Sequence, residues 1–150
     1  MPKKCSIMLA IAVVLMSGCS GTRPTHIGIQ PGGKLAACPD TPNCVTSFAS
    51  VDDKRHYIEP IEADADKWRK LPRILAETPR ITVMEQGENY LKAEATTRIW
   101  RFVDDLEFLY DPTQSLIHVR SASRIGWSDF GVNRKRIEQI RKQLGDQSLK

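Results

Sequence analysis

Apolar and polar positions change their spacing near residue 80, and this change separates a predicted helix from predicted strands. Between residues 64 and 77, apolar side chains recur every three or four positions, which is the spacing of one helix face. They are Ala65, Trp68, Leu71 and Leu75. Asp64 is suited to cap the N-terminus of this helix. Pro72 lacks the N–H that a helix interior needs, so we expect the helix to be kinked or split there.

From residue 80 onward the spacing is two, which is typical of strands. The predicted strands cover residues 81–85, 90–103, 106–110 and 116–121. The second is longer than a usual strand, so we expect a bulge or a break within it. A last apolar stripe predicts a helix over about 130–144. Ser128 or Asp129 is its natural N-cap, because either side chain can accept a bond from a free amide of the first turn.

The order of elements is therefore helix, four strands, helix. Short connections between the strands favour antiparallel pairing. We predict an α+β fold with a single antiparallel sheet of about four strands, an N-terminal kinked helix and a C-terminal helix packed on one face. The domain is expected to cover residues 35–145, followed by a tail at 146–150. A chain of 150 residues has room for one such domain.

Residues 1–18 have the three parts of an export signal. Lys3 and Lys4 supply the positive start, residues 7–16 form an apolar run, and small residues follow up to Cys19. The run is shorter than the roughly 20 apolar residues that a membrane-spanning helix needs. We therefore predict a signal peptide that is removed from the mature chain.

The end of this signal, Leu15-Met16-Ser17-Gly18-Cys19, resembles the lipobox of bacterial lipoproteins. The resemblance implies that diacylglycerol is attached to the thiol of Cys19, that the chain is cleaved before it, and that the new amine is acylated. Together the acyl chains form a stable membrane anchor, because each buried methylene contributes about 0.8 kcal/mol. Since Ser20 follows rather than aspartate, the lipobox rules imply the outer membrane of a Gram-negative cell, facing the periplasm. An ordinary signal peptide with a chance cysteine is the alternative.

Residues 19–34 are rich in glycine and proline and have almost no periodic apolar pattern. This composition predicts a flexible tether between the lipid and the domain. A coil of this length would hold the domain on the order of 25 Å from its anchor. We expect the domain to work near a membrane without needing to touch it.

Composition and charge argue against nucleic acid as a partner. Hydrophobic residues make up 41% of the chain and charged residues 27%, which indicates a folded domain. The net charge of +4 includes Lys3 and Lys4, so removal of the signal leaves +2 (4 − 2). This charge is too small for a nucleic-acid-binding protein, and no long basic run is interleaved with aromatic residues.

Cys38 and Cys44 are the thiols that remain once Cys5 is removed and Cys19 is acylated. Two cysteines this close together in an exported protein most often form a disulfide. A redox pair would more typically show the spacing Cys-x-x-Cys, and a metal site would need further ligands. The three histidines are scattered along the chain. Neither a metal nor a cofactor is therefore predicted.

The densest polar stretch covers residues 118–136, where a strand is expected to end and the last helix to begin. The residues that we single out are Arg120, Ser121, Ser123, Arg124, Ser128, Asp129, Asn133 and Arg134, together with Arg101, Asp104 and Asp105 from the preceding strands. The helix N-terminus has free amides and a partial positive charge, which favour a bound anion. Phosphate, carboxylate, or a lipid or glycan headgroup would fit this description.

Our hypothesis is a lipid-anchored envelope protein with a binding or accessory role, in which any anionic ligand lies around Arg120, Arg124 and Ser128. A purely structural or interaction lipoprotein is the alternative. Arginine pairs with carboxylate through two parallel hydrogen bonds. In this alternative the same charges serve only to hold the turn against the sheet. Removal of one partner from a buried pair can cost about 3–5 kcal/mol without any ligand being involved.

A serine-dependent envelope hydrolase is the second alternative. Its residue types are present, with Ser121, Ser123 or Ser128 as nucleophile, His118 as base and Asp104 or Asp105 to orient the base. However, the sequence has no Gly-x-Ser-x-Gly turn. His118 also lies three residues before Ser121, which puts their side chains on opposite faces of a strand. The two neighbouring aspartates alternate faces in the same way.

Three separated motifs resemble the domain-of-unknown-function 1499 family. They are Cys38-Pro-x-x-Pro-Asn-Cys44-Val45, Arg101-Phe-Val-Asp-Asp-x-Glu-Phe108, and Arg120-Ser-x-Ser-Arg124-x-Gly-x-Ser128-Asp129-x-Gly-x-Asn133-Arg134. The resemblance covers residues 35–144, nearly the whole predicted domain. It implies an exported or membrane-associated protein, bacterial lipoproteins included. It implies no reaction.

Overall fold

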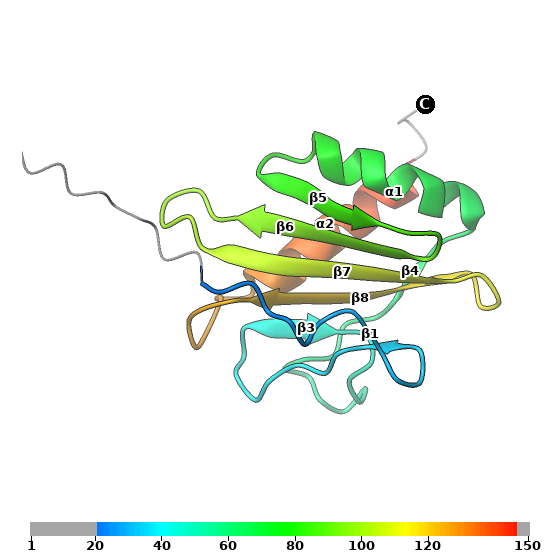
Figure 1. Cartoon of the computed structure of the whole chain (residues 1–150). Coiled ribbons are helices and arrows are strands. Elements are labelled where there is room, and N and C mark those ends of the chain that lie inside the picture. Colours follow the sequence, from blue (N-terminus) through cyan, green and yellow to red (C-terminus); the bar gives the residue numbers. More distant parts are fainter. Residues whose placement is uncertain (1–20, 147–150) are drawn as a thin grey trace, which may run out of the picture.

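The computed structural model describes residues 21–146, which form two sheets and two helices (Figure 1). The main sheet has six strands. Five of them follow the order β3 (Cys44–Thr46), β8 (Leu116–Ser123), β7 (Val103–Asp111), β6 (Tyr90–Thr96) and β5 (Ile81–Gln86). The sixth, β4 (Ile61–Glu62), also pairs with β8. All these pairs are antiparallel.

The hydrophobic core lies between one face of the main sheet and the helices α1 (Ala65–Glu77) and α2 (Val132–Gly145). Strand alternation directs one set of side chains of β6, β7 and β8 to this face. The largest buried side chains there are Leu91, Leu106, Phe108, Ile117 and Val119, which meet Leu71 and Leu75 of α1 and Ile137 and Ile140 of α2. Each such side chain contributes about 1.5–3 kcal/mol when it is fully buried.

The N-terminal segment, residues 21–38, crosses the opposite face of the main sheet over β7 and β8 (Figure 1). This segment contains the small sheet of β1 (Ile29–Gln30) and β2 (Lys34–Leu35). The backbone N–H of Gly28 donates to Glu107 at 2.6 Å, and Nε of Arg23 donates to Glu94 at 2.8 Å. The described part of the expected tether, residues 21–34, is therefore folded against the sheet in place of a flexible coil.

The prediction of a single sheet of about four strands with an N-terminal kinked helix is wrong. The main sheet has six strands, a second sheet has two, and four short strands precede α1. Those four strands are only two or three residues long. An alternation with a period of two cannot be recognised over so few residues.

Pro72 does not divide the first helix. α1 is one element of 13 residues with Pro72 inside it. Proline removes one backbone hydrogen bond, and the burial of Leu71 and Leu75 in the core offsets this loss. At the start of α1, the side chain of Asp64 accepts a hydrogen bond from the N–H of Lys67 at 2.9 Å, so Asp64 is the N-cap.

The strand predicted over residues 90–103 breaks in its second half. β6 ends at Thr96, β7 begins at Val103, and residues 97–102 form a loop between them. The loop is closed by a hydrogen bond from the N–H of Thr97 to the carbonyl of Phe102 at 2.8 Å. Ile99 and Trp100, which a continuous strand would place on its two faces, are exposed in this loop.

No helix within residues 21–146 is long and apolar enough to cross a membrane. The predicted signal peptide, residues 1–18, and the predicted lipidation site, Cys19, lie outside the described residues. The predicted tail at 146–150 lies outside them as well, except for its first residue.

Candidate functional site

Strand register gathers charged side chains on the sheet face that the N-terminal segment covers. Glu94 of β6 is paired with Asp105 of β7, and Glu107 of β7 is paired with Arg120 of β8. Residues directly opposite each other in antiparallel strands point to the same face. We use the name ion network for Arg23, Glu94, Asp105, Glu107, Arg120 and Arg124. Their ion pairs form two groups, Arg23–Glu94–Arg124–Asp105 and Glu107–Arg120.

Arg124, which follows the end of β8, makes three side-chain hydrogen bonds. Its Nε and Nη2 atoms donate to the two carboxylate oxygens of Asp105 at 2.8 and 2.7 Å, and Nη2 also donates to Glu94 at 2.5 Å. The hydrogen bond to Asp105 raises the pKa of Arg124, although burial opposes this change. Burial alone would raise the pKa of Glu94, but donation from Arg124 and Arg23 outweighs burial and lowers it.

Glu107 is the most deeply buried acid of the ion network, with 0% of its surface exposed. Its carboxylate accepts hydrogen bonds from the N–H of Gly28 at 2.6 Å, the hydroxyl of Tyr90 at 2.9 Å and Nη1 of Arg120 at 3.1 Å. These donors, one of them a cation, compensate for the removal of the carboxylate from water. Burial raises the pKa of Tyr90, and the charge of Glu107 raises it further.

Arg120 is buried but only partly bonded. Its side chain is 4% exposed, and its contact with Glu107 is a single bond through Nη1. The Nε atom is buried and has no hydrogen-bond partner among residues 21–146. Arg120 also borders a cavity of about 620 Å³ between the sheet and the N-terminal segment. The walls are residues 22–27 and 37–39 on one side and Asp105, Arg120, Ala122, Ser123 and Arg124 on the other.

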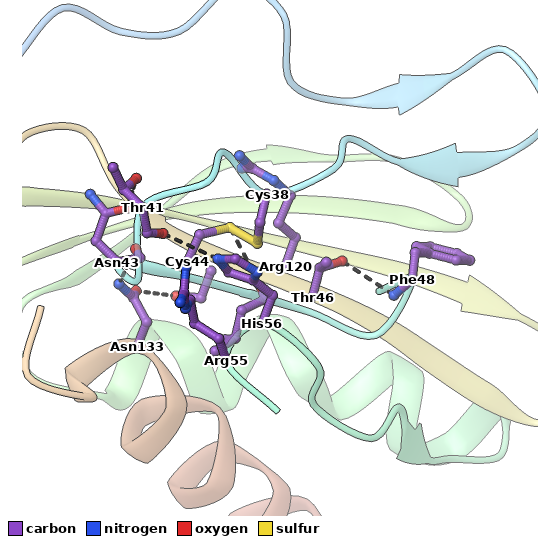
Figure 2. Close-up of a disulfide and its surroundings, with 12 residues drawn as sticks. Cys38, Thr41, Asn43, Cys44, Thr46, Phe48, Arg55, His56, Arg120 and Asn133 are labelled. Carbon is purple, nitrogen blue, oxygen red and sulfur yellow. Dashed lines mark hydrogen bonds between the residues drawn. A yellow bond between two sulfur atoms is a disulfide. The ribbon is translucent and has the colours of Figure 1, made fainter. Parts of the chain in front are cut away.

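The predicted disulfide between Cys38 and Cys44 is confirmed, with a Cα–Cα distance of 5.6 Å. Cys44 is buried in β3, where it pairs with Ala122 of β8, and Cys38 lies in the cavity wall. Figure 2 shows the side chain of Arg120 extending from β8 past the disulfide. The disulfide therefore ties one wall of the cavity to the main sheet.

Asn133, in the first turn of α2, is the centre of a second polar cluster on the helix side of the sheet. Its Oδ1 atom accepts from Ser121 Oγ at 2.5 Å and from Arg136 Nη1 at 2.9 Å. Its Nδ2 atom donates to Ser123 Oγ and to the carbonyl of Asn43, both at 3.1 Å. Figure 2 shows Asn133 of α2 beside Asn43 of the disulfide loop. This Asn133 cluster joins α2, β8 and the disulfide loop.

Asp104 and Asp105 serve different clusters, as the alternation of strand faces predicts. Asp104 accepts from Arg136 Nη2 at 2.7 Å on the helix side, whereas Asp105 accepts from Arg124 on the other side. Arg136, which was not among the residues singled out from the sequence, is therefore the partner of Asp104. Arg134 instead donates to the carbonyl of Arg55 at 3.2 Å.

Ser128 and Asp129 are used in the turn before α2. Ser128 Oγ accepts from the N–H of Phe130 at 3.2 Å. The carboxylate of Asp129 accepts from the N–H of Gly131 at 2.9 Å and from the N–H of Asn133 at 2.7 Å. Asp129 thus satisfies amides at the start of α2 that an anion would otherwise bind.

Comparison with known families agrees with the resemblance found from the three sequence motifs. The family model of DUF1499, a protein of unknown function, matches residues 34–144. The chain belongs to the DUF1499 family. No curated protein and no solved structure matches it. The DUF1499 range contains the Asn133 cluster and the acids of the ion network, but Arg23 and Gly28, which bind those acids, precede it.

The serine hydrolase arrangement is not assembled in this DUF1499 domain. None of the side-chain hydrogen bonds of Ser121, Ser123 or Ser128 leads to a histidine within residues 21–146. The hydroxyl beside His118 is that of Ser47, at 3.2 Å from Nδ1, and the ring of His118 stacks on Phe48. The described residues also contain no group of three or more histidine, cysteine, aspartate or glutamate side chains that could hold a metal ion.

Sequence analysis missed the site residues that come from outside the two later motifs. Glu94 lies on the polar face of a predicted strand, and its register with Asp105 could have suggested the contact. Asn43 stands inside the cysteine motif, which drew attention only to its thiols. Arg23 and Gly28 had no signal, because they lie in a segment whose composition predicts a coil.

Proposed function

We propose that this DUF1499 protein is a lipoprotein of the cell envelope, acylated at Cys19, whose domain binds a small anionic group in the cavity at Arg120. The binding role is the one expected from the sequence, but the binding site lies at a different place. The anion would lie between the N-terminal segment and strands β7 and β8, away from the turn before α2.

Support for the anchor comes from the sequence of residues 1–19, with its basic start, apolar run and lipobox. Mass spectrometry of the protein purified from membranes tests this directly. The expected N-terminal peptide begins at Cys19 and has the mass of a diacylglyceryl group plus one acyl chain. A peptide that begins elsewhere, or an unmodified Cys19, contradicts the anchor. Cys19→Ser should abolish labelling with a fatty acid probe.

The observation that carries the binding proposal is the partly bonded guanidinium of Arg120. Arginine has five N–H donors, and Arg120 uses one of them on Glu107. A buried donor without a partner costs about 1–3 kcal/mol and needs an explanation. A carboxylate or two phosphate oxygens would accept from the guanidinium edge that carries Nε, through two parallel bonds.

The other candidate residues have less to offer a ligand. Arg124 uses Nε and Nη2 on carboxylates, and Ser121 and Ser123 are bonded within the Asn133 cluster. Asp129 already occupies the amides at the start of α2. These contacts favour the structural alternative for those residues, so Arg120 alone separates the binding role from a purely structural one.

The charge of the ion network limits the kind of anion. Three arginines and three carboxylates give a formal charge of zero (3 − 3). A group with one negative charge, such as a carboxylate or a phosphodiester, needs less compensation there than a dianion does. The cavity of about 620 Å³ has room for more than the charged group itself.

Acetate and dimethyl phosphate are suitable probes, measured by thermal unfolding and calorimetry at constant ionic strength. At 100 times its Kd, a ligand stabilises the native state by about 2.7 kcal/mol, which is a clear rise in Tm. Arg120→Lys retains a cation for Glu107 but loses the guanidinium edge, so it should fold and lose the response. Arg134→Lys, which changes an arginine outside the cavity, is the matched control.

Equal Tm values with probe and with chloride, in the parent and in both variants, would contradict the binding role. The unpaired Nε of Arg120 would then be a cost of the fold alone. In that case the structural alternative, an interaction lipoprotein stabilised by its Arg–carboxylate network, would replace the proposal. The anchor would be unaffected, because mass spectrometry tests it separately.

A further inference from the structure

Large apolar side chains are exposed at one end of the main sheet. They belong to two loops, residues 97–102 between β6 and β7 and residues 124–131 between β8 and α2. In the first loop Trp100 is 69% exposed, and in the second Trp127 is 72% and Phe130 89% exposed. Ile99 and Val132 are exposed beside them. Several large apolar side chains exposed together at one end of a sheet are candidates for a contact with a protein or a membrane.

Strand pairing places the two loops side by side. Thr96 at the end of β6 pairs with Val103 at the start of β7, and the next residue of β7, Asp104, pairs with Ser123 at the end of β8. Both loops therefore leave the same end of the sheet, as Figure 1 shows. We call this region the exposed end, made of Arg80, Arg98, Ile99, Trp100, Arg101, Trp127, Phe130, Val132 and Lys135.

The charges of the exposed end are positive and available. Arg80, Arg98, Arg101 and Lys135 are exposed, and none has an acidic partner within residues 21–146. The nearby acids are already bonded, with Asp104 on Arg136 and Asp129 on backbone amides. The available charge at this end is therefore that of four cations.

A hollow of about 480 Å³ opens among these cations, between the start of β5, the end of β6 and the start of α2. Arg80, Arg98, Lys135 and Arg136 line it together with Thr97 and Val132. Basic side chains around a hollow, with aromatic side chains on adjacent loops, are the features that an anionic lipid headgroup and the acyl region below it require.

Three residues of the exposed end have an unfavourable backbone conformation. Arg80, Arg101 and Phe130 have φ values of 65°, 55° and 53°, in the left-handed region that residues other than glycine seldom adopt. Each such residue costs roughly 1–2 kcal/mol. Phe130 has this unfavourable conformation although its side chain is exposed and adds nothing to the core. Backbone strain of this kind is common at functional surfaces.

The described chain also starts at this end. Gly21, the first described residue, packs on Arg124 and Ile125, and a Cβ atom added to it would lie 2.8 Å from Cβ of Arg124. Its φ of 71° and this close approach both require glycine. Cys19 stands two positions earlier in the sequence. A lipid on Cys19 would therefore hold the membrane next to the exposed end.

We propose that the exposed end docks on an anionic phospholipid bilayer, with Trp100, Trp127 and Phe130 entering the interface and the four cations contacting headgroup phosphates. The inference rests on the proposed anchor for the membrane's position, and it replaces the expectation of a domain that does not touch the membrane. Binding of a free phosphate would not account for the exposed aromatic side chains of the two loops. Binding of a protein partner would not account for the position of Gly21, and so of the nearby Cys19, at this end of the sheet.

Vesicle co-sedimentation tests the docking without the anchor. The buried core of the described residues runs from Val45 to Leu144, so a chain of residues 20–150 retains it and lacks both Cys19 and the apolar run. The vesicles are phosphatidylcholine alone or mixed with phosphatidylglycerol. We expect binding to the mixed vesicles, weaker binding to the neutral ones, and a blue shift of tryptophan fluorescence with quenching by brominated lipid.

Two variants divide the contributions. Arg98→Glu/Lys135→Glu should weaken binding at least about thirtyfold, because each cation near an anionic surface contributes roughly a factor of five to ten. Trp100→Ser/Trp127→Ser should weaken it about tenfold and abolish the blue shift, since binding scales with the apolar area buried. Lys67→Glu/Lys70→Glu on α1 and Ile29→Ser/Val51→Ser change equal charge or exposed apolar surface elsewhere and should bind as the parent does.

Absence of binding to the mixed vesicles overturns the proposal, as does equal binding by all variants. Binding of inorganic phosphate that Arg98→Glu/Lys135→Glu removes, without vesicle binding, would assign the hollow to a soluble anion instead. Self-association that Trp100→Ser/Trp127→Ser removes, without vesicle binding, would assign the loops to a second copy of the chain. An unmodified Cys19 would remove the anchor and leave the vesicle result standing.

Discussion

Arginine has two opposite uses in this domain. In the ion network, Arg124 is buried and its Nε and Nη2 atoms donate to carboxylates on two neighbouring strands. At the exposed end, Arg98 and Arg101 are open to solvent and have no acidic partner within residues 21–146. The first use fixes the positions of strands, and the second leaves charge available for something outside the chain.

The residues of one polar sequence motif do not all belong to one site. The motif from Arg101 to Phe108 contributes an exposed arginine at one end and the buried Glu107 at the other. The motif from Arg120 to Arg134 likewise contains the buried Arg120 and the exposed Trp127. Neighbours in the sequence thus belong to different regions, because strand alternation and loop exits separate them.

Arg124→Ala should have the largest effect on stability. It leaves the buried carboxylate of Asp105 without its cation and leaves Glu94 with Arg23 alone, which costs about 3–5 kcal/mol. The melting temperature should fall by about 10–20 °C. Arg98→Ala, at the exposed end, should change the free energy of unfolding by less than about 0.5 kcal/mol. Urea denaturation of both variants measures the difference, and equal losses would break the comparison.

Much of the fold could be predicted from apolar spacing. α1, α2 and the strands β5, β7 and β8 lie where periods of 3.6 and two placed them, since each buries one face in the core. The short strands β1 to β4 could not be predicted, because a period of two cannot be recognised over two or three residues. For β3 and β4 the pairing partner, β8, is also distant in the sequence. A bulge or break was expected within residues 90–103, but its position after Thr96 was not. That position depends on the turn that lets β7 pair with β6.

The candidate site was predicted less well, for a different reason. Sequence analysis found the right residue types in Arg120, Arg124, Asp104 and Asp105. It could not assign partners, because these depend on register and on loops that return from elsewhere. Arg136 binds Asp104, and Asn133 binds the carbonyl of Asn43, 90 positions away. The N-terminal segment was taken for a coil, since contacts through Gly28 and Arg23 leave no periodic pattern.

Removal of the disulfide should have an intermediate effect, confined to the interior. Cys38→Ala/Cys44→Ala frees a loop with a sequence separation of 6, which should lower the free energy of unfolding by about 2 kcal/mol. Because the disulfide holds the cavity wall, the response to acetate should weaken, whereas vesicle binding at the exposed end should not change. Loss of vesicle binding in this variant would show that the two regions are coupled.

Glu94 lies where the network meets solvent, and its titration should produce a smaller effect. Its folded pKa is lowered from 4.5, so the stabilisation is complete above pH 4.5 and is lost as the pH falls through the folded pKa. Glu94→Gln should therefore lose less stability than the parent between about pH 6 and pH 3.5 in urea unfolding. Glu62→Gln, an exposed acid on β4, is the control and should keep the parent's pH dependence.

His118 provides the finest test, because it shares the sheet face of the ion network but has no carboxylate bonded to it. Burial lowers its pKa from 6.5, Lys34 lowers it further, and Asp111 opposes the change. The unfolded chain therefore takes up the proton first, so stability is complete above pH 6.5 and declines as the pH falls towards the folded pKa. His118→Phe, which keeps an aromatic ring against Phe48, should remove this slope, and His26→Gln should not. If the pH dependence of stability is unchanged in His118→Phe, His118 does not contribute to it. The imidazole would then be solvated in the folded state, and this part of the sheet face would differ from the buried ion network.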